Sequence, residues 1–129
     1  MSRFPSLLFL TSIAVGASGC LAKSKFCTFI LIDGLEVTVN DSRSGAKVCD
    51  ATVTARDGAY AEVLQLSPSV VDDAGTPTRC AYVGAGERAG HYTIEIAAVG
   101  YAAKTITADV AAGECHVTPA RPMVAIDPI

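Results

Sequence analysis

Few side chains in this 129-residue chain could carry out chemistry. Its two histidines, His91 and His116, each stand at the start of a predicted β segment, so we expect both to lie in water at strand ends. Neither the Gly-x-Ser-x-Gly turn of serine hydrolases nor the His-Glu-x-x-His sequence of zinc proteases occurs. Catalysis needs a nucleophile, a base or a metal assembled in a pocket. The sequence therefore predicts a protein that is not an enzyme and has no cofactor.

Three further segments could have a function, but each is also explained as an ordinary turn. Asp72-Asp73 could hold Ca²⁺ with loop carbonyls, but the spaced ligands of a Ca²⁺ loop are missing, which favours a solvated turn. Gly84-Ala-Gly86 is not followed by a helix whose N–H groups could hold a phosphate. Glu87 and Arg88 are expected to pair with each other at an exposed turn. Without a basic patch or any tryptophan, the composition also excludes a typical nucleic-acid-binding protein.

The five cysteines carry the clearest chemical information. Cys20 stands near the N-terminus, and the other four are Cys27, Cys49, Cys80 and Cys115. Four cysteines in an oxidising compartment predict two disulfides, with three possible pairings. A metal site is the alternative, but the four are spread along the chain without any Cys-x-x-Cys pair, which disfavours it.

The N-terminus explains the odd number of cysteines. Residues 4–15 are apolar after Arg3, which is the length of a signal-peptide core and too short to span a bilayer. The segment Ala17-Ser-Gly-Cys20 resembles a bacterial lipobox, in which the cysteine is acylated and becomes the new N-terminus, although Ala17 replaces the usual leucine. The alternative is an ordinary signal peptide cleaved after Ala22. Lipidation of Cys20, or its removal with the signal peptide, would leave an even number of cysteines for disulfides.

These observations divide the chain into three parts. We expect a lipoprotein signal peptide at residues 1–19, a lipidated N-terminus with tether and first β segment at 20–34, and a folded domain at 35–129. The mature chain has the length of one domain, and because only Arg3 is lost, it keeps 9 basic and 13 acidic side chains. Its membrane contact would come from acyl chains on Cys20, since stable anchoring takes more than one chain.

The folded part alternates between β-type segments and turns. Strands are expected at residues 35–40, 48–55, 59–66, 78–83, 91–98, 105–110 and 115–126. Turns separate them, the longest being the loop 67–77 and a glycine-rich turn at 84–90. Pro119 and Pro122 indicate that the last segment lies at a sheet edge or contains a bulge. No segment shows a helical stripe, so the pattern predicts an all-β, antiparallel sandwich.

Two segments resemble a known family. Val37–Gly45 followed by Ala51–Ala55 is similar to the opening of carboxypeptidase-regulatory-like domains, and Gly90–Tyr101 is similar to the Gly-x-Tyr-…-Gly-Tyr segment late in such domains. The resemblance covers about residues 35–126 and implies a seven-stranded transthyretin-like, Ig-like sandwich. Its motifs form strands and turns, so it informs about fold more than about function. Tyr92 is expected to fill the core with its hydroxyl bonded to a loop, and Tyr101 to cover a turn.

The resemblance also bears on the disulfides and on one enzymatic activity. In such sandwiches the first strand and a late strand run parallel side by side, which implies the pairs Cys27–Cys115 and Cys49–Cys80. Some transthyretin-like proteins hydrolyse 5-hydroxyisourate with a C-terminal Tyr-Arg-Gly-Ser motif. This chain ends Ala125-Ile-Asp-Pro-Ile without that motif, so the hydrolase activity is not implied.

Together these features predict an exported lipoprotein, anchored to a membrane of the cell envelope, at the outer membrane or facing the periplasm. It would act as an accessory module that binds an envelope protein or a glycan through loops 67–77 and 84–90. The alternative is a purely structural envelope component. Tyrosines exposed together on one face would favour a glycan, because apolar rings on a surface mark binding sites; the four tyrosines are Tyr60, Tyr82, Tyr92 and Tyr101.

Overall fold

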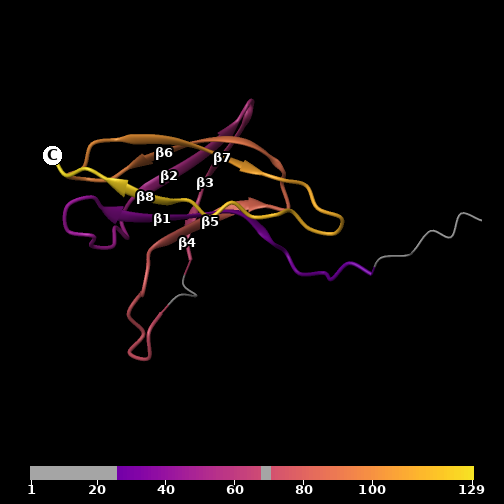
Figure 1. The fold of residues 1–129 in the computed structure, drawn as a ribbon, viewed down its shortest axis with the longest axis horizontal. Helices are drawn as coiled ribbons and strands as arrows, with labels where there is room; N and C mark the ends of the chain where they lie inside the picture. The colour runs from indigo at the N-terminus through magenta and orange to yellow at the C-terminus, as the bar shows by residue number, and fades with distance from the viewer. Residues whose placement is uncertain (1–25, 68–70) are drawn as a thin grey trace, which may run out of the picture.

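The computed structural model describes residues 26–67 and 71–129, which form two packed β-sheets (Figure 1). The strands are β1 (Asp33–Asp41), β2 (Thr52–Asp57), β3 (Tyr60–Val63), β4 (Gln65–Leu66), β5 (Ala81–Gly86), β6 (Gly90–Ala97), β7 (Lys104–Val110) and β8 (Met123–Ile126). One sheet has the order β4-β5-β1-β8, and the other has the order β3-β2-β6-β7. The all-β sandwich prediction is confirmed at this level. Within the described residues, no helix is long and apolar enough to cross a membrane.

The structure has eight strands where seven were expected. The segment predicted as one strand over 59–66 divides at Leu64, which is buried to 4% exposure. Before Leu64, β3 pairs with β2 in one sheet; after it, β4 pairs with β5 in the other. The chain thus changes sheets inside one apolar run, a step that strand periodicity does not reveal.

The first strand is the centre of its sheet. Leu35, Val37 and Val39 are fully buried, as their alternation predicts. Thr38, on the opposite face of this interior strand between β5 and β8, is also buried. The pairing of β1 with β8 is parallel, and the other strand pairs of the described chain are antiparallel. The parallel pair agrees with what the family resemblance implied for the first and a late strand, and the other described pairs agree with the antiparallel prediction.

The facing sheet supplies the other half of the core. In β6, Tyr92, Ile94 and Ile96 point inward with exposures of 1%, 0% and 1%, in agreement with the predicted alternation. Val53 and Ala55 of β2 lie beside them, since β2 pairs with β6. The hydroxyl of Tyr92 donates a hydrogen bond to the carbonyl of Arg88, as expected for a core ring tied to a turn.

The strand β5 departs most from its prediction. The expected glycine-rich turn at 84–90 shrinks to residues 87–89, because β5 continues through Gly86. Gly84 lies within β5 and is packed against the facing chain: a Cβ there would lie 2.5 Å from the side chain of Leu64.

At the C-terminus, β8 lies at the edge of its sheet, as the nearby prolines predicted.

Two disulfides join these elements. Cys27 pairs with Cys115, with Cα atoms 5.2 Å apart, and Cys49 pairs with Cys80, with Cα atoms 5.1 Å apart. These are the pairs that the family resemblance implied, and the parallel neighbours β1 and β8 account for the first. The second links the segments leading into β2 and β5, which belong to different sheets.

Candidate functional site

The described residues that precede β1 form a short segment at one end of the sandwich, which we call the N-terminal arm (residues 26–32). It leaves the sandwich at the end opposite the C-terminus (Figure 1). Between this arm, the β5–β6 turn and the loop from β7 to β8 lies an open cavity of about 460 Å³. Its lining includes apolar and ionisable side chains: Phe29, Ile30, Leu31, Glu87, His116 and Val117.

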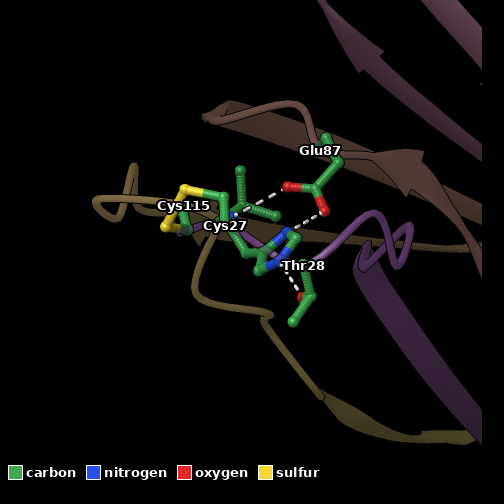
Figure 2. Close-up of a disulfide and its surroundings, with 6 residues drawn as sticks. Cys27, Thr28, Glu87 and Cys115 are labelled. Carbon is green, nitrogen blue, oxygen red and sulfur yellow. Dashed lines mark hydrogen bonds and ion pairs between the residues drawn. A yellow bond between two sulfur atoms is a disulfide. The ribbon is translucent and has the colours of Figure 1, made fainter. Parts of the chain in front are cut away.

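A chain of hydrogen bonds lines this cavity (Figure 2). The Thr28 hydroxyl lies 2.9 Å from Nε2 of His116, and Nδ1 of His116 lies 2.5 Å from Oε1 of Glu87. The same Glu87 carboxylate accepts a hydrogen bond from the backbone N–H of Ile32 at 2.8 Å and one from that of Val117 at 3.2 Å. Three segments far apart in the sequence therefore meet at one carboxylate.

Two expectations about these residues are wrong. His116 does not lie free in water, because its side chain is only 25% exposed and contacts both Thr28 and Glu87. Glu87 does not pair with Arg88, because the turn points the two side chains to different neighbours. Glu87 itself adopts φ = 51°, an uncommon value for a residue with a side chain.

The contacts of Glu87 also set its charge. Partial burial would raise the pKa of its carboxyl, but the hydrogen bonds from Ile32, His116 and Val117 outweigh that effect and lower the pKa below its ordinary value. Glu87 therefore stays ionised at neutral pH.

The Cys27–Cys115 disulfide stands directly beside this network (Figure 2). Cys115 precedes His116 in the β7–β8 loop, and Cys27 precedes Thr28 in the arm, so the covalent bond and the hydrogen bonds hold the same two segments. The loop is tight: a Cβ at Gly113 would lie 2.2 Å from the carbonyl oxygen of His116. A glycine is needed here because no side chain fits between these backbones.

The order of groups at Thr28, His116 and Glu87 is that of a hydrolase triad, namely hydroxyl, imidazole and carboxylate. In such triads the carboxylate orients the imidazole, which takes the proton of the hydroxyl. Here the carboxylate also binds two backbone N–H groups of different segments. The arrangement is therefore well suited to hold the arm on the sandwich, and it is the one place in the described chain where a hydroxyl, a histidine and an acid meet in series.

The remaining candidates lie apart from this cavity. His91 is 88% exposed and pairs with Asp109 on β7, which raises the pKa of the imidazole; such an exposed pair contributes little stability. The Asp72 carboxylate accepts hydrogen bonds from the N–H groups of Ala74 and Thr76, as in a self-contained turn. Among the described residues, no group of three or more His, Cys, Asp or Glu side chains is placed to hold a metal.

A second polar cluster surrounds Arg88 and has a structural role. Its guanidinium binds Asp57 at 2.9 Å and the Tyr92 hydroxyl at 3.0 Å, and it stacks 3.9 Å from the ring centroid of Tyr60. Burial, together with a hydrogen bond to Glu62, raises the pKa of Tyr60 to about 12. These contacts tie the β2–β3 hairpin to the β5–β6 turn.

The tyrosines do not form an exposed platform. Tyr82 and Tyr92 are buried, and Tyr60 and Tyr101 are partly buried. The Tyr101 hydroxyl donates to the carboxylate of Asp41, which agrees with its expected role in covering a turn. The four tyrosines therefore offer no shared exposed surface on which sugars could stack.

Sequence reasoning missed the cavity at the arm because its members come from three separate segments. The one usable signal was the apolar run Phe29-Ile-Leu-Ile32 beside a cysteine, which was assigned to a tether and a first β segment. Cys20 lies outside the described residues. No family model matches the chain, and neither a curated protein nor a solved structure matches it.

Proposed function

We propose that this chain is an exported lipoprotein held to an envelope membrane through acylated Cys20. Its mature domain would be a transthyretin-like module of the carboxypeptidase-regulatory-like type that binds another protein and catalyses no reaction. The observation that carries the proposal is the cysteine pairing. Cys27, Cys49, Cys80 and Cys115 are all consumed in disulfides, so Cys20 is the one cysteine left for a lipid. Disulfides form in the oxidising compartments that exported proteins enter.

The long loop before β5 supports binding of a protein. Its described residues 71–79 project from the sandwich (Figure 1). Val63 and Leu66, on the chain that leads into it, are 51% and 42% exposed, and Val71 in the loop itself is 48% exposed. A projecting loop with apolar side chains suits contact with another protein. The partly or fully buried tyrosines argue against the glycan alternative.

The anchor is tested by mass spectrometry of the protein purified from its native host. We expect an N-terminal cysteine at position 20 that carries acyl chains, and loss of the membrane-bound pool in a Cys20→Ser variant. An unmodified Cys20, or an N-terminus at residue 23, would contradict the lipoprotein proposal.

The protein partner is tested by photocrosslinking in envelope extracts. A photoreactive amino acid at position 71 is expected to capture one defined protein, and the same group at Val99, on an exposed turn, is the matched control. Equal capture from both positions, or none from either, would favour a structural component without a separate ligand.

One observation favours a second candidate function. The series Thr28–His116–Glu87 has the geometry of an acyl-transfer site beside an open cavity. The non-enzymatic proposal requires that the pure domain hydrolyse a p-nitrophenyl ester no faster than its Thr28→Val variant. A rate that the hydroxyl-free variant loses would instead establish a hydrolase, since valine keeps the shape and removes the nucleophile.

A further inference from the structure

Of the ten large hydrophobic side chains that are exposed in the described chain, four lie in the N-terminal arm. Phe26 is 95% exposed, Phe29 108%, Ile30 63% and Leu31 69%. These four large side chains lie within six consecutive residues. Soluble proteins rarely expose such a contiguous apolar patch unless it meets a partner.

The arm is held in this exposed position by specific contacts. Cys27 is bonded covalently to Cys115, and the Thr28 hydroxyl contacts His116 (Figure 2). The N–H of Ile32 also donates a hydrogen bond to Glu87. Leu31 also touches the sandwich, since a Cβ at Gly86 would lie 3.3 Å from its side chain. A surface fixed in advance loses little conformational entropy when it binds. The exposed apolar side chains of the arm are therefore held in a fixed position, where they can contact a partner.

The position of the arm in the chain indicates what it contacts. Phe26 follows Cys20 by six residues, and a fully extended chain of that length spans about 20 Å. If acyl chains on Cys20 lie in a bilayer, Phe26, the first residue of the arm, can never be farther than that from the lipid surface. Tethering at this distance makes the membrane by far the most concentrated apolar partner available to the arm.

The charges near the arm indicate whether it would bind the membrane through anionic headgroups or through apolar contact. Lys23 and Lys25 precede it, Asp33 lies at its other end, and Glu87 and Glu114 lie in the facing turn and loop. Two positive and three negative charges give the region no preference for anionic lipids. The contact is therefore made by apolar side chains entering the interface, and it should depend only weakly on salt.

We propose that the N-terminal arm is a second membrane contact, in which Phe26, Phe29 and Ile30 insert into the bilayer interface and fix the orientation of the sandwich. This inference rests on the proposed lipid anchor at Cys20. It places the arm end of the sandwich on the membrane and the opposite end, with the C-terminus, away from it (Figure 1).

The test supplies the anchor chemically. The chain from Cys20 to Ile129, with both disulfides formed, keeps one free thiol for coupling to maleimide lipids in phosphatidylcholine vesicles. Since the protein has no tryptophan, Phe29→Trp adds a single reporter to the arm. Val99→Trp is the matched control: Val99 is 93% exposed and lies beside Gly100, whose carbonyl accepts from the C-terminal Ile129 N–H.

On coupled vesicles we expect the emission of the Phe29→Trp variant to shift to the blue and to be quenched by brominated lipids, at low and at high salt. The Val99→Trp variant should show neither effect. Equal emission from both variants, or an effect that salt abolishes, would overturn the inference. Because coupling does not require acylation by the host, this result is independent of the mass spectrometry that tests the lipid anchor itself.

Discussion

The two disulfides should differ in their contribution to stability, in the order opposite to that expected from loop length. The variants to compare are Cys27→Ala/Cys115→Ala and Cys49→Ala/Cys80→Ala, both carrying Cys20→Ser to prevent thiol exchange. Cys27–Cys115 encloses 88 residues and Cys49–Cys80 encloses 31. Because the smaller loop is nested in the larger, the outer bond effectively closes about 57 residues when the inner one is intact.

Loop closure alone ranks the outer bond first. It assigns about 4.2 kcal/mol to a loop of that effective length and about 3.7 kcal/mol to the inner loop. Burial reverses this ranking. Cys80 is fully buried in the core, so truncation to alanine adds a transfer and cavity cost of about 1–2 kcal/mol. Cys27 and Cys115 are both exposed, and loss of their bond frees the arm in the folded state, which returns roughly 2 kcal/mol of chain entropy.

We therefore expect the free energy of unfolding to fall by about 2 kcal/mol without the outer bond and by about 5 kcal/mol without the inner one. Urea denaturation of both variants and the parent, followed by circular dichroism, measures these values. The slope of each transition reports whether the unfolded states remain comparable. If the outer bond costs as much as the inner one or more, the arm is an integral part of the fold, and the reasoning about its exposure is refuted.

Three further substitutions test the contacts around the arm and the opposite end. Gly113→Ala places a methyl group 2.2 Å from the His116 carbonyl oxygen and should lower the free energy of unfolding by about 1–3 kcal/mol in urea titrations, whereas a Cβ that fits would leave it unchanged. The pKa of Glu87 is lowered in the folded state, so its stabilisation is present above the pKa of a free glutamate and disappears as pH falls through the lowered value. In the parent protein, the NMR chemical shift of the Ile32 amide should change as Glu87 is protonated, and in the Glu87→Gln variant this change should be absent. An Ile32 amide shift that acid leaves unchanged in the parent would contradict this role of Glu87. Tyr101→Phe removes one partly buried hydrogen bond and should cost about 0.5–1.5 kcal/mol by thermal denaturation, while no change would mean that water replaces it.

Much of the sandwich could be predicted from periodicity because its inner faces obey strict alternation. Leu35, Val37 and Val39 in β1 and Ile94 and Ile96 in β6 all point inward as expected. Alternation reports which side chains share a face, but it does not report which sheet a strand joins. The division of the 59–66 segment between two sheets at its one buried leucine was invisible for that reason.

The cavity at the arm could not be predicted for a different reason. Thr28, Glu87 and His116 are separated by 59 and 29 residues, so only tertiary structure brings them together. The local signal at Glu87 was misleading as well. A glutamate beside an arginine in a glycine-rich segment suggests an exposed pair, yet the turn directs Arg88 to Asp57 and Glu87 to the arm.

The arm shows that a hydrophobic pattern alone does not predict whether an apolar segment is buried in the core or faces a partner. An apolar run such as Phe29-Ile-Leu-Ile32 has the same composition whether it enters a core or faces a partner, because burial in protein and burial in lipid remove the same surface from water. The neighbouring chain distinguishes the two cases: the run precedes the first strand, is joined to the β7–β8 loop by the disulfide at Cys27, and follows Cys20 in the sequence. The Cys27–Cys115 bond holds the apolar side chains of the arm in solvent, and a lipid anchor on Cys20 would bring these side chains to the membrane.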